Sequence, residues 1–205
     1  MTPDDVRQTV ALAIETLTPA TDRNWPATPA GDLDWTCWET VEHMADDLFA
    51  YAAQLGPSKP SVTTHVPFGW QRRREGAPLL TVFVAPADGP AGLLTVFETC
   101  GAMLAAMVET APPARRSFHN YGPSDPSGFA AMGVVEVLVH MNDVATGLGL
   151  PWNPPPELCA AALTRLFPTA PPDHEPWPTL LWCTGRRDLP GLPAPKSWKW
   201  DASPR

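Results

Sequence analysis

Residues 125–151 read "DPSGFAAMGVVEVLVHMNDVATGLGLP" and predict a long apolar helix. Asp125 suits the N-cap position and Pro126 the first position of the helix. An ordinary apolar core would not contain Glu136, His140 and Asp143. At about 100° per residue these three side chains lie on one stripe of the helix. The stretch therefore predicts a core helix that carries a polar cluster on one face.

Apolar periodicity outside this stretch predicts four more helices. They cover residues 3–18, 35–56, 91–110 and 155–168. In the second of them Thr36 and Glu39 have the spacing of a capping box, and Gly56 with Pro57 indicates its end. The segment 79–85, "LLTVFVA", is either a short strand or an extended connection.

The lengths of the connections predict the topology, because antiparallel helices need only a few linking residues. The long segment between Gly56 and Ala91 therefore indicates a parallel pair. We expect an all-α four-helix bundle, up-down-down-up, with one long crossover between helices two and three. Residues 1–205 form one predicted domain, with a core over about 1–165. The last 38 residues hold nine prolines and four tryptophans, so 166–205 should form an irregular arm on the bundle, with one short helix near 179–185.

Composition limits the classes of function. Hydrophobic residues make up 44% and charged residues 18%, which is typical of a soluble globular protein, and the net charge of -8 argues against nucleic acid as a partner. The N-terminus is acidic, and no apolar run reaches the roughly 18 residues of a membrane span. We therefore expect a cytoplasmic protein with no membrane partner. The four scattered cysteines are predicted to be buried free thiols.

Glu136 and His140 stand one turn apart, a spacing at which one helix can hold a single metal ion. A buried hydrogen-bonded pair or a solvated stripe are the alternatives. Asp143 is placed to orient the imidazole of His140 or to act as a catalytic carboxylate, unless it is a plain surface acid. A third ligand must come from another helix, and only His43 lies in one. Its own helix gives mixed evidence, since His43 shares a face with Asp47 that is typical of solvated residues.

Several other residues allow two interpretations. The run Arg72 to Arg74 is a solvated charge cluster or an anion contact. His119 and Tyr121 cap the loop before residue 125 or belong to the site. Trp38 is expected to pack in the core, whereas Trp35 is assigned to neither core nor site. Cys100 lies in an apolar helix that would raise its pKa, and is therefore an unlikely nucleophile.

The order of these features resembles the DinB-like superfamily. The matching stretches are "LDWTCWETVEHMADDLFAYAAQLG" and "GFAAMGVVEVLVHMNDVATGLGLPW". A Trp-Thr pair opens the first, a His follows seven residues after Thr36, and Glu-x-x-x-His-x-x-Asp lies in the second. Over residues 1–165 the chain is most similar to the actinobacterial branch with the N-terminal domain of mycothiol-dependent maleylpyruvate isomerase and related mycothiol S-transferases. A bias toward Arg, Ala and Pro, typical of a GC-rich coding sequence, agrees with this.

The resemblance implies a divalent metal, usually zinc, held by His43, Glu136 and His140, with mycothiol as co-substrate. It further implies an S-transferase or isomerase that acts on an electrophilic small molecule, with Asp143 as a catalytic residue. The maleylpyruvate isomerase has a further α/β domain that this chain replaces with the arm, so that particular isomerisation is not expected. The alternatives are a ligand-binding or stress-response protein without turnover and a metal-independent biosynthetic enzyme. Related bundles often pair through helix faces, so a homodimer remains open.

Overall fold

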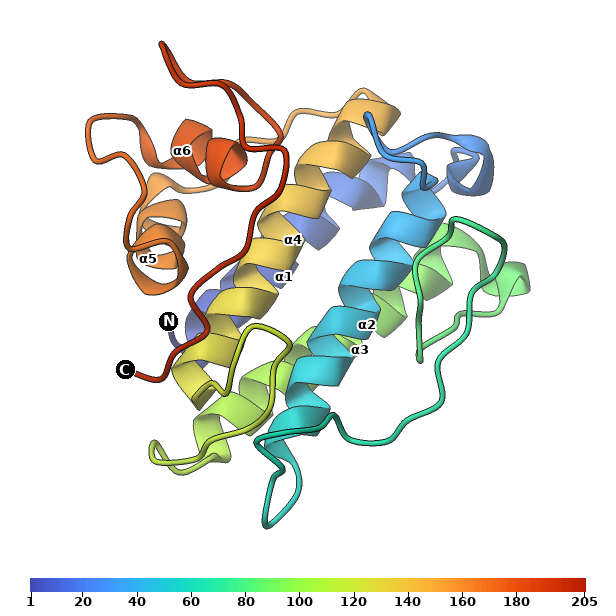
Figure 1. The fold of residues 1–205 in the computed structure, drawn as a ribbon. Helices are drawn as coiled ribbons and strands as arrows, with labels where there is room; N and C mark the ends of the chain where they lie inside the picture. Colours follow the sequence, from blue (N-terminus) through green and yellow to red (C-terminus); the bar gives the residue numbers. More distant parts are fainter.

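The computed structural model describes residues 1–205 as an all-helical chain (Figure 1). Three short 3₁₀ segments accompany the helices, and no strand is formed. The six helices are α1 (Pro3–Leu17), α2 (Cys37–Leu55), α3 (Gly89–Thr110), α4 (Pro126–Leu148), α5 (Pro156–Leu166) and α6 (Pro176–Cys183). The prediction of an all-α fold is confirmed, and the segment 79–85 is an extended connection rather than a strand.

The predicted helix caps are formed. At the start of α2, Thr36 accepts the backbone N–H of Glu39, whose carboxylate accepts the backbone N–H of Thr36 in return. At the start of α4, Asp125 accepts the N–H of Gly128 at 2.7 Å. These contacts satisfy backbone donors that a helix leaves free at its N-terminus. Both termini could be predicted because the residues that form them are neighbours in the sequence.

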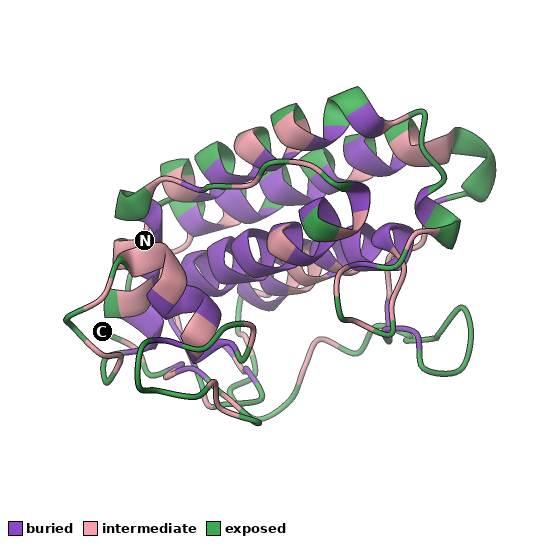
Figure 2. Cartoon of the chain, turned by 90° about the horizontal axis from the view of Figure 1, so that it is seen from above, coloured by how far each residue is buried: buried purple, intermediate pink, exposed green.

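The helices α1 to α4 pack on one another as a bundle, with α1 and α2 each against α3 and α4. Figure 1 shows α2 and α3 running in the same direction and α4 in the opposite one. Buried residues line the facing sides of the helices, and exposed residues lie on their outer sides (Figure 2). The long segment between α2 and α3 therefore connects a parallel pair, as its length predicts.

Helix α4 lies at the centre of the packing, and nearly all of its residues are buried. A Cβ atom at Gly133 would come within 2.6 Å of the Leu104 side chain on α3 and within 3.0 Å of Leu48 on α2. The absence of a side chain there lets both neighbouring helices approach α4 closely. This close packing brings α2 and α4 side by side along the face that carries the polar residues.

One expectation about membranes needs correction. Two segments, Pro86–Thr110 and Pro126–Leu148, are long and apolar enough to cross a membrane, contrary to the prediction that no segment would be. The mean hydropathy of both windows is raised by Ala, Val, Leu and Met, which also fill the core of a bundle. In the second window 94% of the residues are buried inside the protein, and a core helix has this same property.

The crossover is held by acidic residues of α2. Glu42 is fully buried and accepts two hydrogen bonds from Arg73, at 2.6 and 2.7 Å, and one from the backbone of Val84. Glu39 accepts two hydrogen bonds from Arg74. The three arginines of the run are exposed, as expected of a charge cluster, and two of them also neutralise carboxylates that α2 buries.

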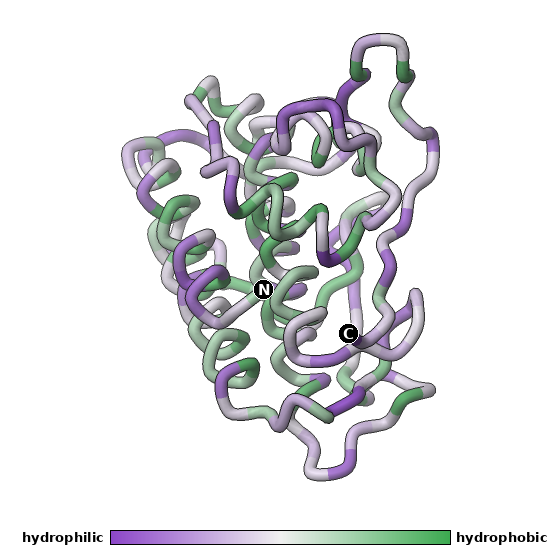
Figure 3. The backbone as a smooth tube through the Cα atoms, turned by 90° about the vertical axis from the view of Figure 1, so that its left-hand side faces the viewer, coloured by the Kyte–Doolittle hydropathy of each residue, from purple (hydrophilic) through white to green (hydrophobic).

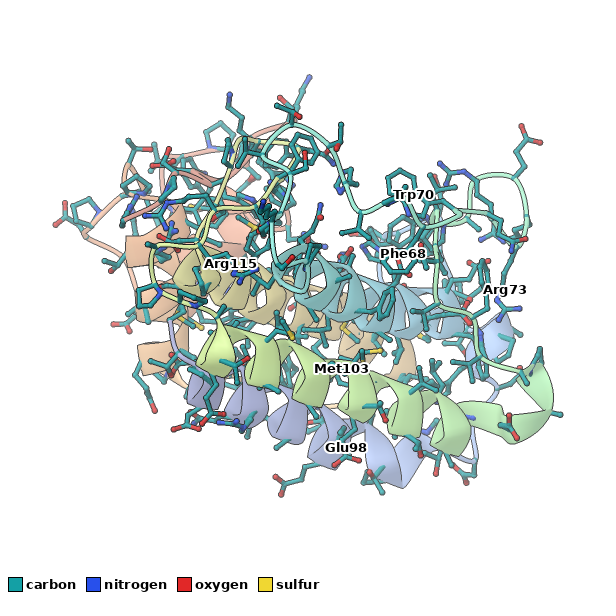
Figure 4. All side chains as sticks on the ribbon, turned by 90° about the horizontal axis from the view of Figure 1, so that it is seen from below. Phe68, Trp70, Arg73, Glu98, Met103 and Arg115 are labelled. Carbon is teal, nitrogen blue, oxygen red and sulfur yellow. The ribbon has the colours of Figure 1, made fainter.

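Figure 4 shows the outer side of this crossover beside α2 and α3. Phe68 and Trp70 are 44% and 51% exposed there, although Phe68 contacts Phe49 of α2 with ring centroids 5.2 Å apart. Met103 is exposed on α3. The apolar side chains on this surface are separate from the polar face between α2 and α4.

Residues of the C-terminal arm pack on the bundle. The arm contains α6 and ends in an extended segment whose Trp200 and Ala202 are buried with the bundle core. The last residue donates its backbone N–H to Asp125 at 2.7 Å, and the N-terminal amine donates to Ser127 at 3.2 Å. Both chain ends therefore lie at the start of α4, and Figure 3 shows the two ends near each other.

Candidate metal centre

The packing of α2 against α4 brings together the three predicted metal ligands. His43 comes from α2, and Glu136 and His140 come from α4, one turn apart. Each residue offers a ligand atom, and these atoms all lie within 4.8 Å of one another. The two imidazole rings meet edge to face with centroids 5.0 Å apart. This group could hold a metal ion.

The donor set fits a divalent cation such as zinc. Two imidazole nitrogens and one carboxylate oxygen are the ligands of many zinc enzymes with three protein ligands. Nδ1 of His43 is buried without a hydrogen-bond partner, and Nε2 lies 3.2 Å from Asp47. A buried nitrogen without a partner costs free energy unless another group satisfies it. His43 therefore carries a buried ring nitrogen whose hydrogen-bonding capacity the protein leaves unused.

The electrostatic environment shifts the pKa values of the two histidines in opposite directions. Burial, together with the nearby His140, lowers the pKa of His43 to about 4, so that its ring is neutral at neutral pH. Burial also opposes charge on His140, but hydrogen bonds with Asp143 and Glu136 outweigh it and raise the pKa of that ring. Burial opposes ionisation of Glu136 too, yet the contact with His140 lowers the pKa of its carboxyl group.

Asp143 supports the ring of His140. Its Oδ2 lies 3.1 Å from Nδ1 of His140, while Nε2 of the same ring lies 3.3 Å from Glu136. This leaves Nε2 directed toward the other ligand residues. The contacts favour the first predicted role of Asp143, the orientation of the imidazole. A direct part in catalysis stays a prediction.

Two residues of the site were missed in the sequence. Arg186, from the arm, donates to both carboxylate oxygens of Asp143 at distances between 2.7 and 3.1 Å. Asp47 lies beside His43, and burial together with the charge of Glu136 raises the pKa of its carboxyl group. Its spacing of four residues from His43 is a signal that could have found it. No local pattern identifies Arg186, which is 43 residues away from its partner.

A cavity of about 540 Å³ opens onto these residues. Trp35, at the entrance to α2, stacks on His140 with ring centroids 5.9 Å apart and donates its indole N–H to the carbonyl of Gly76. Trp198 of the arm lines the cavity as well, together with Asp32 and Asn142. The volume suits a small organic molecule. The structure thus places Trp35 at the site and Trp38 in the core.

His119 does not line the cavity. It accepts the backbone N–H of Tyr121 at 3.1 Å, which confirms the predicted role within the loop. The rings of Tyr51 and Trp200 lie against it, and burial lowers the pKa of His119 to about 4. The four cysteines are free and buried. Burial raises the pKa of Cys100 to about 11, in agreement with its exclusion as a nucleophile.

Comparison with known proteins does not assign the chain to a family. No family model matches the chain, and neither does any curated protein or solved structure.

Proposed function

We propose that this protein is a cytoplasmic metal-dependent enzyme of the DinB-like type that transfers a low-molecular-weight thiol, mycothiol, to an electrophilic small molecule. The observation that carries the proposal is the convergence of His43, Glu136 and His140 beside a cavity large enough for a substrate. The resemblance of the two ligand-bearing helices to the mycothiol-dependent branch supplies the identity of the thiol.

The three ligand residues would hold the cation and leave at least one coordination position open, as in catalytic rather than structural zinc sites. A bound divalent cation would supply Lewis acidity that favours thiolate over thiol at neutral pH. The reaction would be addition to an activated double bond, displacement of a leaving group, or isomerisation by reversible thiol addition.

The charges of the site support an anionic ligand. The lowered pKa values of Glu136 and Asp143 favour two carboxylates that carry negative charge, whereas burial raises the pKa of the Asp47 carboxyl group. Arg186 and a divalent cation would carry three positive charges. The two carboxylates of Glu136 and Asp143 balance two of these charges, and a thiolate would balance the third. Trp35 and Trp198 provide apolar walls against which the carbon skeleton of an electrophile can pack.

Metal analysis by mass spectrometry tests the first part of the proposal. The wild-type protein should retain close to one equivalent of metal, and His43→Ala, Glu136→Gln and His140→Ala should each lose it. His174→Ala is the matched control, because this histidine lies on the arm, away from the cavity. Wild-type protein without stoichiometric metal would refute the proposal at this step.

Thiol transfer tests the second part. The metal-loaded protein is incubated with mycothiol and a chromogenic electrophile, and the product is measured before and after chelation. Activity that disappears on chelation and returns with zinc supports the enzyme. Metal binding without turnover for any thiol and electrophile would favour the non-catalytic binding protein, and activity that survives chelation would favour the metal-independent enzyme.

A further inference from the structure

The short helix α6 of the C-terminal arm ends beside the candidate metal centre. After α6 the chain turns at Gly185, whose φ of +73° is strained for residues with a side chain. A Cβ atom there would also meet the carbonyl of Pro195 at 3.0 Å. The backbone N–H of Arg186 donates to Leu181 at 2.8 Å and closes the turn. The turn fixes the backbone from which Arg186 extends into the cavity.

The guanidinium group of Arg186 is held mainly by one carboxylate. Its Nε lies 3.0 Å from Oδ1 of Asp143 and its Nη2 lies 2.7 Å from Oδ2, which is the paired geometry that arginine makes with a carboxylate. Its Nη1 donates to the carbonyl of Thr184 at 3.2 Å. The two side chains are only 13% and 8% exposed. Their geometry is therefore defined by protein contacts more than by water.

The same carboxylate holds a metal ligand. Oδ2 of Asp143 lies 3.1 Å from Nδ1 of His140. If Nε2 binds a cation, Nδ1 must carry the proton and donate it. The contact of 3.3 Å between Nη2 of Arg186 and Nδ1 would then join two donors, so Asp143 must accept from both groups at once. Without Arg186, the short side chain of Asp143 would be free to rotate away from the ring.

We propose that Arg186 is a positioning residue of the metal centre, which fixes Asp143 so that His140 presents Nε2 to the cation. This inference rests on the proposed function. It also assigns a role to the arm, since a residue far from the ligands in the sequence would set their affinity for metal. A deletion within the arm should therefore weaken metal binding even though all three ligands remain.

The test measures the affinity of the full-length protein for Zn²⁺ by competition with a chromophoric chelator. Arg186→Gln should raise the dissociation constant roughly 10- to 100-fold, as expected when a group that supports a ligand is lost. Arg187→Gln is the matched control, since it makes the same change of charge at an adjacent exposed residue. It should bind Zn²⁺ within about twofold of wild type, because mutation away from such contacts has small effects.

Two further variants separate positioning from a structural role. Asp143→Asn should weaken Zn²⁺ binding to a similar extent. The double variant Arg186→Gln/Asp143→Asn should have nearly the same affinity as the single variant that binds Zn²⁺ less tightly, because both changes disrupt one connected unit. Arg186→Lys should recover part of the affinity. Lysine keeps the charge but not the paired geometry. In the cobalt-substituted protein, Arg186→Gln should change the visible absorption spectrum, whereas Arg187→Gln should not.

The outcomes are distinguishable. A wild-type protein that binds no metal overturns the proposed function and this inference with it. A wild-type protein that binds Zn²⁺ while Arg186→Gln binds it as tightly as Arg187→Gln overturns the inference alone, and so do additive effects of Arg186→Gln and Asp143→Asn. If Arg186→Gln does not fold, the Zn²⁺ affinities of Arg186→Lys and Asp143→Asn are compared with that of wild type instead. Wild-type affinity in both variants overturns the inference.

Discussion

Removal of Arg73 should destabilise the fold, because it would leave a charged carboxylate in the core. Glu42 is 0% exposed and accepts both of its charged hydrogen bonds from Arg73. Loss of one partner of a buried ion pair typically costs about 3–5 kcal/mol. The Arg73 side chain is 27% exposed, so water reaches part of the pair, and we expect about 2–4 kcal/mol for Arg73→Gln. In a chain of this length that corresponds to a decrease in Tm of roughly 4 to 16 °C.

The assay is urea unfolding followed by circular dichroism, with Arg72→Gln as the matched control. Arg72 belongs to the same run, but its side chain donates only to the carbonyl of Ala77. Arg72→Gln should therefore lower the free energy of unfolding by well under half of the decrease expected for Arg73→Gln. Adding Glu42→Gln to Arg73→Gln should restore part of the stability, because a neutral amide is cheaper to bury than an unpaired carboxylate. Equal effects of the two arginine variants, or a double variant less stable than Arg73→Gln alone, would refute the reasoning.

Three more predictions concern pH, metal and thiol reactivity. The pKa of His119 is about 4 in the folded protein against 6.5 for an ordinary histidine, so the unfolded chain takes up the proton first as pH falls from 6.5 to 4. Over this pH range the free energy of unfolding should fall by up to roughly 3 kcal/mol. In urea unfolding at several pH values, His119→Gln should show a weaker dependence of this free energy on pH than His174→Gln, and equal slopes for the two variants would contradict the prediction. Saturating Zn²⁺ should raise the Tm of wild type but not of His140→Ala, as thermal scans with and without chelator would show. Burial raises the pKa of Cys100 and Cys183 to about 11, so an alkylating reagent at pH 8 should label neither until the protein is unfolded; rapid labelling of the native protein would contradict it.

The helices could be predicted from the sequence because the interactions that define them are local. The side chains that cap α2 and α4, Thr36 with Glu39 and Asp125, lie within four residues of the groups they satisfy. The spacing of Glu136 and His140 is equally local, and this spacing alone identified two side chains that can bind the same metal ion. The direction of α3 relative to α2 followed from the length of the connection, since a short one could not have spanned a helix.

The rest of the site depends on contacts between distant segments. Periodicity places His43 on a polar face of its helix and cannot show that α4 covers that face. Arg186 lies in an irregular arm where no period relates it to Asp143, so only the tertiary structure shows the pair. Hydropathy likewise could not separate a buried bundle helix from a membrane span for residues 126–148, because both environments exclude water.

The polar face of α2 explains why helical periodicity was misleading at His43. A wheel distinguishes polar from apolar positions, and the usual inference is that the polar ones face water. Here Glu42 faces the arginines of the crossover, whereas His43 lines the cavity and Asp47 lies beside His43 and Glu136 of α4. One helix thus uses its charged residues to fix the connection to α3 and its histidine to contribute to the candidate site. In this helix the polar face therefore contacts protein groups, because the arginines of the crossover neutralise its carboxylates and α4 covers its histidine.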